Sequence, residues 1–563
     1  GAAAVLRHFG LGPHDTAAVV LPNGPEMATA FLATAIAGIS APLNPAYRRD
    51  EFSFYLDDLG ARLLLIGEEM PSPAREVARE RGIRIVEVGA RADAAGIFTL
   101  DGAVPMCEGT VTPAPEATAL VLHTSGTTAR PKLVPLSHRN LTAAAAQIAA
   151  TLALGPDDRC LNVMPLFHIH GLVAALLASL LAGASVVCSP GFLAPRFFGW
   201  LRECGPTWYT AVPTMHQSIL ARAADPESAA AIAKGRLRFV RSSSAALPRR
   251  VLDELEATLQ VPVIEAYGMT EASHQMASNP LPPGTRKPGS VGLAAGPEVA
   301  VMDGSGTLLP PGATGEVVIR GPSVTAGYVN NPEANARSFT QGWFRTGDEG
   351  VLDGDGYLTL TGRLKEQINR AGEKISPLEV DSALMHHPAV AQALTFSVAH
   401  PLLGEDLAAA VVLKSGAAAT AWDLQEFVAT RLAYFKVPHQ ILLVEAIPTG
   451  PTGKLQRIGL AERLGVVAIV PVDDNDRTPP RSPTEEIVAR VWEEVLGRPV
   501  AGVRQNFFAL GGDSILAARL VARLWELLAI ELSLLAFFHT PSVEGVAAAV
   551  DLLLDPEETD VPR

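Results

Sequence analysis

Cysteine is scarce in this sequence, and the few cysteines are far apart. None belongs to a Cys-x-x-Cys pair, and none has a histidine at the spacing of a metal site. The four are Cys107, Cys160, Cys188 and Cys204. Disulfide frameworks need paired cysteines, and zinc sites need closely spaced ligands. We therefore expect neither, and the expected location is the reducing cytoplasm.

The sequence also lacks an excess of positive charge. Its 563 residues carry 45 lysines and arginines against 59 aspartates and glutamates, a formal net charge of −14. Such a chain has no generic attraction for nucleic-acid phosphates or anionic lipids. Hydrophobic residues make up 48% of the chain and charged residues 18%, which suits packed cores and argues against global disorder. We expect about three or four domains and no nucleic-acid partner.

No apolar run is long enough to cross a membrane. The uncharged stretch 172–188 falls short of the ~20 residues that a span needs. Gly183 divides it into an expected helix and a short expected strand at 185–188. The first residues lack the basic start of a signal peptide, and we expect no membrane partner. The sequence opens with an expected helix and strand that look like the continuation of a fold rather than its beginning. We therefore expect the N-terminal start of the domain to be truncated.

Strands and helices alternate through the first two thirds of the chain. An expected strand at 16–21, for example, precedes an expected helix at 25–37. Such alternation is typical of parallel sheets covered on both faces. From 298 to 360 the pattern changes to strands and turns. We therefore predict a large α/β domain over 1–362 that ends in a β-rich subdomain.

The remaining third divides into three segments. Residues 363–465 alternate strands and helices on a smaller scale, which predicts a small α+β domain. Residues 466–483 are rich in proline and acidic side chains and are interpreted as a linker. Residues 484–555 are helical throughout, with a start signal at Thr484 and a stop at Gly497. This last segment is predicted to be an all-α helical bundle.

One loop carries the composition of a phosphate-binding site. The segment HTSGTTARPKLVPLSH, 123–138, lies between an expected strand at 119–123 and an expected helix around 140–152. Hydroxyls, backbone amides and a lysine on a strand–helix loop can bind phosphate, although the pattern is not a Walker A loop. The candidate ligands are Thr124, Ser125, Gly126, Thr127, Thr128 and Lys132.

This loop resembles the ATP-binding signature of the adenylate-forming superfamily, which includes acyl-CoA synthetases, nonribosomal adenylation domains and luciferases. Four further motifs resemble that superfamily and follow in its order, so the resemblance covers about residues 1–465. They are EAYGMTE at 265–271, GWFRTGD at 342–348, GRLKEQINRAGEKISPLEVD at 362–381 and PTGPTGKLQR at 448–457.

The resemblance implies a role for each motif residue, and those roles suit the chemistry. ATP and a carboxylate are two anions that must meet in line, and Lys454 is implied to bridge the carboxylate and the α-phosphate. Thr270 is implied to contact the α-phosphate, and Glu271 to hold Mg²⁺. The other implied contacts are those of Tyr267 with adenine and of Asp348 and Arg363 with the ribose, and Lys365 is the implied hinge of the small domain.

The phosphate loop departs from the superfamily at two positions. Ala129 and Leu133 stand where glycine is usual, and side chains there should stiffen the loop because the conformational freedom of glycine is lost. The T-x-RPK form of the loop nevertheless resembles that of oxalate–CoA ligases, which act on a small diacid.

The helical tail carries a second motif. The segment NFFALGGDSILAARL, 506–520, presents Ser514 at the start of an amphipathic helix, where the helix dipole favours phosphate. The segment resembles the phosphopantetheine attachment motif of peptidyl or acyl carrier proteins, with 484–555 as the carrier domain. That resemblance implies 4′-phosphopantetheine on Ser514 and a phosphopantetheinyl transferase as a partner. The plainer alternative is an Asp-Ser cap on a core helix.

The acid is expected to be small and polar. Amino-acid-activating relatives carry an aspartate in an FDxS-like segment, whereas PLFHIHG, 165–171, offers no carboxylate there. Segments 237–247 and 269–283 again resemble oxalate–CoA ligases, which implies an acyl pocket of His168, His170, Ser244 and His274. Three imidazoles and a hydroxyl suit a second carboxylate or a hydroxyl on a short acid. A bound carboxylate would favour protonated histidine.

We therefore predict an AMP-forming acid–thiol ligase: an adenylation–carrier didomain that uses ATP and Mg²⁺ and loads its own carrier, as in nonribosomal peptide or polyketide biosynthesis. A downstream synthase or condensation enzyme is the expected further partner. Three alternatives remain at this point: a ligase that uses free CoA, an amino-acid-activating module, and a non-catalytic interaction platform. The presence of Lys454, Glu271 and Asp348 argues against the platform.

Overall fold

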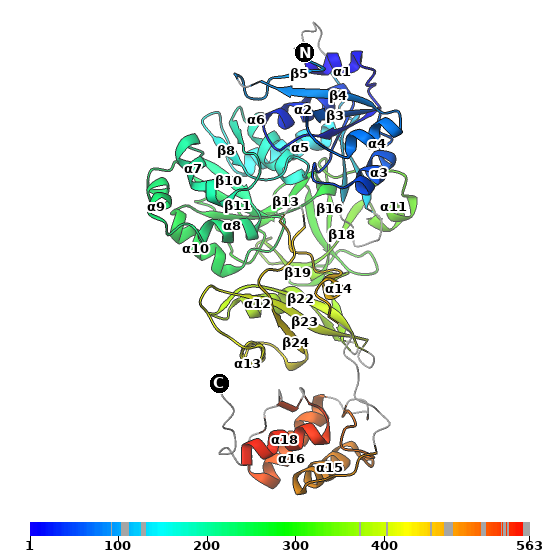
Figure 1. The fold of residues 1–563 in the computed structure, drawn as a ribbon, viewed down its shortest axis with the longest axis vertical. Coiled ribbons are helices and arrows are strands. Elements are labelled where there is room, and N and C mark those ends of the chain that lie inside the picture. The colour runs from blue at the N-terminus through cyan, green and yellow to red at the C-terminus, as the bar shows by residue number, and fades with distance from the viewer. Residues whose placement is uncertain are drawn as a thin grey trace. The chain divides into compact units, whose positions relative to one another are not determined.

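The computed structural model describes most of the chain. The described residues are 1–91, 93–102, 112–124, 131–370, 373–400, 404–450, 453–466, 477–507, 510, 514–530, 532, 536–537 and 540–554. The chain divides into one unit of Gly1–Lys365 with Thr449–Lys454, and a second of Glu366–Pro448 with Leu455–Arg563. Figure 1 labels the helices and strands of both. Within the described ranges, no helix is both long and apolar enough to cross a membrane.

The first unit begins with a seven-stranded sheet in the order β5-β4-β3-β1-β2-β6-β7. Its inner strands pair in parallel, whereas β5 and β7 pair antiparallel at the two edges. The strands are β1 Thr16–Val20, β2 Ile39–Pro42, β3 Leu63–Gly67, β4 Arg84–Ala90, β5 Phe98–Leu100, β6 Thr118–Thr124 and β7 Lys132–Ser137. The helices of this segment are α1 Ala2–His8, α2 Pro25–Ala37, α3 Arg49–Asp58 and α4 Ala74–Glu80.

A second seven-stranded sheet has the order β14-β13-β12-β11-β10-β8-β9 and is parallel from β9 to β12. Its strands are β8 Arg159–Asn162, β9 Ser185–Cys188, β10 Trp208–Ala211, β11 Phe239–Ser243, β12 Val263–Met269, β13 His274–Ser278 and β14 Leu293–Ala294. The accompanying helices are α5 His138–Thr151, η1 His170–Leu177, α6 Ala178–Leu181, α7 Ala194–Cys204, α8 Pro213–Leu220, α9 Pro226–Ala233 and α10 Arg249–Leu259. The predicted parallel sheets are confirmed.

The alternation of side chains along these strands builds a core on each face of the second sheet. Trp208 and Phe239 face a core that they share with the first sheet and with α2, α5 and η1. Their neighbours Tyr209 and Val240 face the opposite core, which α7, α8 and α10 cover (Figure 1). Any polar side chain on the first of these faces is therefore enclosed between the two sheets.

One local prediction in this unit is wrong. The phosphate motif joins two antiparallel strands, β6 and β7, rather than a strand and a helix. The reason is that side chains alternate between two cores from Leu133 to Leu136, as in a strand. The helix and strand predicted within 172–188 are confirmed. The helix starts as a π-helix, η1, in which a Cβ on Gly171 would lie 2.3 Å from the Pro165 carbonyl oxygen.

A β-rich layer completes the first unit, as predicted. Its sheet is antiparallel, in the order β15-β16-β18-β17 with β19 beside β18. The strands are β15 Glu298–Met302, β16 Thr314–Arg320, β17 Phe339–Thr340, β18 Trp343–Leu352 and β19 Leu358–Arg363, and the helix is α11 Pro332–Ser338. The register of β18 and β19 pairs Asp348 with Arg363.

The second unit opens with a smaller α+β segment. Its sheet has the order β21-β20-β23-β22, with β24 parallel to β23. The strands are β20 Ile368–Arg370, β21 Glu373–Ile375, β22 Val390–His400, β23 Gly404–Leu413 and β24 Gln440–Leu443. The helices are α12 Pro377–Met385, α13 Ala421–Ala429, η3 Tyr434–Lys436 and α14 Leu460–Arg463. Near its middle, Arg457 forms ion pairs with Glu366 at 3.1 Å and with Asp381 at 2.9 Å.

The end of the chain is helical, as predicted. The helices α15 Pro483–Leu496, α16 Ser514–Leu528 and α18 Val543–Leu554 share a core in which Trp492 packs edge-on against Phe507, with ring centroids 5.0 Å apart. Helix α15 starts earlier than Thr484, because the Ser482 hydroxyl accepts the Glu485 backbone N–H at 3.1 Å.

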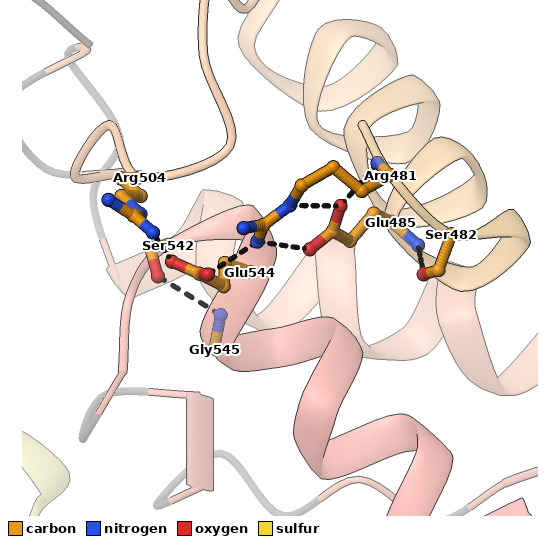
Figure 2. Close-up of polar contacts among 7 residues, drawn as sticks. All are labelled: Arg481, Ser482, Glu485, Arg504, Ser542, Glu544 and Gly545. Atoms are coloured by element: carbon orange, nitrogen blue, oxygen red, sulfur yellow. Dashed lines mark hydrogen bonds and ion pairs between the residues drawn. The ribbon is translucent and has the colours of Figure 1, made fainter. Parts of the chain in front are cut away.

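Ion pairs connect the starts of α15 and α18. Arg481 contacts Glu485 at 2.8 Å and also Glu544 on α18, and Arg504 contacts Glu544 at 2.9 Å (Figure 2). The backbone of Thr478 accepts the Val503 N–H at 3.0 Å. Contacts with the helical region therefore begin inside the segment that the sequence marks as a linker.

Candidate active site

A buried carboxylate lies where β12, β18 and β19 meet. Arg363 Nε donates to Asp348 Oδ1 at 2.7 Å, and the Tyr267 hydroxyl donates to Asp348 Oδ2. Burial, and then the Asp348 charge, raise the pKa of Tyr267, so the phenol stays protonated and can donate. The two donors hold Asp348 in one orientation, and each of its oxygens retains a lone pair for a further donor such as a ribose hydroxyl.

A second carboxylate follows directly after β12. Thr270 and Glu271 belong to the 3₁₀ turn η2, Thr270–Ala272, and the Glu271 carbonyl accepts the Thr325 N–H at 2.7 Å. The Tyr328 hydroxyl donates to Glu271 Oε1 at 2.8 Å, and Lys132 Nζ lies 4.3 Å from the centre of the Tyr328 ring. Burial raises the pKa of Glu271, because the charged carboxylate is less stable away from water. A cation bound beside it would stabilise the charged form.

Tyr328 is a site residue that sequence reasoning missed. It contacts both Glu271 and Lys132 but lies in a loop far from either in sequence, outside every quoted motif. A tyrosine in a glycine-containing loop has no spacing signal of its own, so only the fold reveals its position.

The predicted phosphate loop is described only at its two ends. Thr124 and Lys132 pair across the β6–β7 ladder, with the Thr124 hydroxyl 3.4 Å from the Lys132 carbonyl. Leu133 is buried in the ladder, 8% exposed, so its side chain belongs to the core. The predicted ligands Ser125, Gly126, Thr127 and Thr128, together with Ala129, lie outside the described residues.

Lys454 lies in a loop that packs within the first unit. The Thr214 hydroxyl at the start of α8 donates to the Gly453 carbonyl at 2.7 Å, and Gly450 N–H donates to the Lys454 carbonyl at 2.8 Å. Gly453 has φ +76°, and a Cβ there would lie 3.3 Å from Val212. Burial and the charge of Arg363 lower the pKa of Lys454 to about 8, against the opposing charges of Asp348 and Glu271. The loop thus presents a lysine to both carboxylates.

The four residues predicted for the acyl pocket lie together. His170, at the start of η1, contacts the Ser244 hydroxyl through Nδ1 at 3.1 Å and the Thr210 hydroxyl through Nε2 at 2.6 Å. The rings of His170 and His274 meet edge to face with centroids 4.7 Å apart. His168 Nδ1 accepts the His170 backbone N–H at 3.3 Å. Ser244 directly follows β11, whereas His170 and His274 begin η1 and β13.

The backbone of this pocket is strained at three residues other than glycine. Ser244, Ser273 and His274 have φ values of +74°, +52° and +107°. Such conformations cost about 1–3 kcal/mol each and are concentrated at functional sites. Gly268 makes the arrangement possible, because a Cβ there would lie 1.9 Å from the His274 carbonyl.

The three histidines are neutral in the structure. Burial, and then the charge of Lys454, lower the pKa of His168 to about 3. Burial also holds the pKa values of His170 and His274 well below the ordinary range. Without an acid in the pocket these imidazoles therefore act as uncharged donors and acceptors, and the protonation expected from a bound carboxylate would have to overcome this burial.

Arg241 also belongs to this buried cluster and was missed by sequence reasoning. It lies on β11, fully buried, with Nη2 3.1 Å from the Gln275 side-chain oxygen and Nη1 3.5 Å from His274 Nε2. In the sequence it stands between apolar residues and a serine run, where an arginine is usually assigned to an exposed position.

The other predicted positions are described in part. Lys365 is the last residue of the first unit's continuous segment, and Ser514 is the first residue of α16. Nothing is described of the Ser514 side chain or of 511–513. Within the described ranges, no group of three or more histidines, cysteines and acids could hold a metal alone. Mg²⁺ is usually held by one or two carboxylates together with substrate phosphates, so Glu271 fits such an ion.

Comparison with known proteins places this geometry in a family. The AMP-binding enzyme family matches residues 1–329, which include Glu271 and the acyl-pocket residues. The chain belongs to this family of AMP-binding enzymes. The AMP-binding enzyme C-terminal domain matches residues 379–454, and the phosphopantetheine attachment site matches residues 486–550.

Characterised relatives of this AMP-binding enzyme are acid–CoA ligases. The chain is 45% identical to the oxalate–CoA ligase of Arabidopsis thaliana over 467 residues, 81% of this chain and 90% of that protein. It is 37% identical to the sulfoacetate–CoA ligase of Cupriavidus necator over 453 residues, 80% of this chain and 88% of that protein. The ATP-bound structure of MatB from Rhodopseudomonas palustris has a TM-score of 0.75 and 30% identity, covering 83% of this chain and 92% of that one.

These matches establish the coarse chemistry. The protein is an ATP-dependent, AMP-forming ligase of the acid–CoA ligase type with the adenylate-forming fold. Enzymes of this type use ATP and Mg²⁺, and the carrier domain carries 4′-phosphopantetheine. The predicted family and cofactors are therefore confirmed.

Proposed function

We propose that this enzyme activates a small polar carboxylic acid and loads it onto its own carrier domain. The acid's carboxylate attacks the α-phosphorus of ATP, giving acyl-AMP and pyrophosphate. The thiol of 4′-phosphopantetheine on Ser514 then attacks the acyl carbonyl, giving a thioester and AMP. The acid is a diacid or a hydroxy acid and not an α-amino acid. The observation that carries the proposal is the polar cluster in which buried His170 contacts both the Ser244 hydroxyl and the ring of buried His274.

The pocket supports a small polar acid in two ways. Two of its polar groups are enclosed, since His170 is 0% and His274 1% exposed, whereas Ser244 is half-buried. An acid without a distal oxygen would leave such groups unpaired, at about 1–3 kcal/mol for each one. The names of two relatives agree, because oxalate and sulfoacetate are both short acids with a second acidic group. No carboxylate among the residues named above is available to pair with an α-ammonium group.

The residues proposed to bind ATP are those around the carboxylates of Asp348 and Glu271. Asp348 and Arg363 take the ribose, Tyr267 flanks the adenine, and Glu271 holds Mg²⁺. Lys454 and Thr270 stabilise the charge that develops at the α-phosphate during attack. The phosphate ligands are Thr124, Ser125, Gly126, Thr127, Thr128 and Lys132, and His168 lies beside the acyl group.

The small domain, the linker and the carrier domain act in the second half-reaction. The proposed small domain, 363–465, turns about Lys365 after acyl-AMP has formed, and the linker 466–483 lets the carrier domain, 484–555, deliver its thiol. The carrier needs a phosphopantetheinyl transferase, and a downstream synthase or condensation enzyme in the cytoplasm takes the acyl group. This is the arrangement of nonribosomal peptide and polyketide assembly.

A second candidate differs only in the acceptor. Both named curated relatives are CoA ligases, so free CoA could accept the acyl group and leave the carrier as an accessory. In that case the acid specificity would be unchanged, but Ser514 would not be acylated in the absence of CoA.

A panel of acids tests the first half-reaction. Full-length enzyme would be assayed by ATP–pyrophosphate exchange with short diacids, hydroxy acids, benzoate, a medium-chain fatty acid and amino acids. We expect a short diacid or hydroxy acid to have the highest kcat/KM. A best substrate among benzoate, the fatty acid or the amino acids would contradict the acid class, whereas exchange with none would contradict adenylation itself.

A comparison of acceptors tests the second half-reaction. Transferase-modified wild-type enzyme and its Ser514→Ala variant would receive the best acid with or without free CoA. We expect AMP release without CoA only in the modified wild type, with adenylation intact in both proteins. Turnover that depends on CoA and is equal in both proteins would favour the second candidate.

A further inference from the structure

Arg241 is a buried cation without a carboxylate partner. It is 0% exposed, its Nε has no hydrogen-bond partner, and its two contacts are with the neutral groups of Gln275 and His274. Within the described ranges, no aspartate or glutamate pairs with it. Burying an unpaired charge is costly, so buried arginines are normally paired.

Other shielded arginines of this chain follow that rule. Arg457, with a side chain 9% exposed, lies 2.9 Å from Asp381 and 3.1 Å from Glu366. Arg370, with a side chain 12% exposed, lies 2.9 Å from Asp406. Arg241 is more deeply buried than either and still lacks an anion. A purely structural arginine would not need this arrangement.

The sheet register places Arg241 beside the pocket. Arg241 on β11 is the register partner of Thr210 on β10, and the Thr210 hydroxyl contacts His170 Nε2 at 2.6 Å. Side chains alternate along β11, so Arg241 shares the face of Phe239, which looks toward the core containing η1. On its other side Arg241 contacts His274, whose ring packs against that of His170.

The positive charges of Lys454 and Arg241 both act on the histidine cluster, and Arg241 lies against His274. The charge of Lys454 helps to lower the pKa of His168, and the charge of Arg241 helps to lower the pKa of His274. Burial lowers the pKa of Arg241 itself to about 9, so the guanidinium is still charged at neutral pH. Lys454 is the group proposed to hold the reacting carboxylate, which leaves Arg241 for a group at the other end of the acid.

We propose that Arg241, with His274, binds the second acidic group of the substrate and makes the enzyme select short dianionic acids over hydroxy acids. The inference rests on the proposed function and narrows its acid class. A carboxylate or sulfonate at this point supplies the anion that the guanidinium lacks, and a charged hydrogen bond is stronger than a neutral one. A hydroxyl in the same place would fill the space but leave the charge unpaired.

The test uses pairs of acids of equal chain length in ATP–pyrophosphate exchange. Full-length enzyme would be assayed with oxalate against glycolate and with malonate against 3-hydroxypropionate. We expect the wild type to favour the better diacid over its partner by at least about 100-fold in kcat/KM, because a site built for a polar group rejects an analogue that lacks it. In Arg241→Gln we expect kcat/KM to fall about 100-fold for the diacid and less than about fivefold for the hydroxy acid.

Two further variants separate recognition from folding. Arg241→Lys keeps the charge and should keep a preference for the diacid, at a lower kcat/KM. Arg249→Gln removes a surface arginine of α10 that pairs with Asp253 at 2.9 Å, and should leave the ratio between the acids unchanged. The KM for ATP should stay within about twofold in all variants, and thermal melting would show that each is folded.

The outcomes distinguish this inference from the proposed function. A wild type that prefers hydroxy acids, or an Arg241→Gln variant that loses both acids equally while folded, would overturn the role of Arg241 and leave adenylation standing. If Arg241→Gln does not fold, the test rests on the ratio of kcat/KM between diacid and hydroxy acid in the wild type and in Arg241→Lys. A folded Arg241→Lys variant without a preference for the diacid would also overturn the role of Arg241. Exchange with no acid of either kind would contradict the proposed function instead.

Discussion

Replacing Lys454 by alanine should abolish most acyl-AMP formation and spare the transfer that follows. The lysine loop is held by the hydrogen bond from Thr214 to the Gly453 carbonyl, and the charges of Asp348 and Glu271 act on the ammonium group. In the proposed reaction this ammonium bridges the carboxylate and the α-phosphate only while the bond between them forms. Its loss therefore affects the first half-reaction and leaves attack by the thiol on preformed acyl-AMP intact.

The size of the effect follows from the kind of contact that is lost. Removing one preorganised donor that stabilises the charge developing at the α-phosphate in the transition state costs about 3–4 kcal/mol, or about 10²–10³ in rate. Transfer from supplied acyl-AMP should stay within about threefold of the wild-type rate. The matched control is Lys436→Ala, which removes a lysine of the second unit that pairs with Glu379 at 2.7 Å.

The same lysine predicts a pH dependence with a definite sign. Its pKa is lowered to about 8, so the charged form is lost as pH rises through that value. The pH dependence of kcat/KM for adenylation reports the ionisation of groups in the free enzyme. Because Lys454 is such a group, kcat/KM should fall above about pH 8. Lys454→Arg keeps its charge at all accessible pH values, so its lower activity should show no such alkaline fall.

Exchange of labelled pyrophosphate into ATP measures the first half-reaction, and AMP release from supplied acyl-AMP measures the second. Adenylation by Lys454→Ala within threefold of the wild type would refute the role of the lysine. An alkaline fall that persists unchanged in Lys454→Arg would assign the titration to another group. Equal loss of both half-reactions would indicate misfolding of the variant.

Further predictions concern the hinge, the lysine loop and the carrier. Lys365→Pro fixes one backbone dihedral at the proposed hinge, so the rotation of the small domain should be blocked. Thioester formation should then be lost while pyrophosphate exchange persists, and loss of both activities would indicate misfolding. Thr214→Val removes the donor to Gly453 and should slow exchange about fivefold, whereas Thr214→Ser should not; an unchanged rate in Thr214→Val would exclude this anchor. Arg481→Gln should speed amide hydrogen exchange at the starts of α15 and α18 at pH 7 (Figure 2). Arg481 lowers the pKa of Glu485, so this stabilisation is present above the ordinary glutamate value of about 4.3 and is lost as pH falls through the lowered one. A difference between variant and wild type that is equally large at pH 3 would contradict the ion-pair explanation.

Elements with strong local signals could be predicted from the sequence. Helix α2, Pro25–Ala37, has the predicted bounds because Pro25 stands in its first turn and Gly38 follows its end. Strand β9, Ser185–Cys188, was found by its β-branched residues after Gly183. Such signals act within a few residues, so they do not depend on the rest of the fold.

Features that depend on contacts distant in sequence could not be predicted. The sequence predicts a strand–helix loop at the phosphate motif, because its polar residues give no signal for the pairing of β7 with β6. Tyr328 and Arg241 acquire their positions from strands and loops that meet only in the folded chain. The resemblance to oxalate–CoA ligases implied a pocket of His170, Ser244 and His274, but the positive φ angles of Ser244 and His274 have no signal in the sequence.

The most direct test of the central claim is the mass of the carrier region after a single turnover. Transferase-modified full-length enzyme would be mixed with ATP, Mg²⁺ and a labelled short diacid without free CoA, and then digested and analysed by mass spectrometry. The account predicts one labelled acyl group on the phosphopantetheine of the peptide that contains Ser514, absent from Ser514→Ala and from enzyme without ATP. A peptide that stays unacylated while the same enzyme consumes ATP and acylates added CoA would contradict the account.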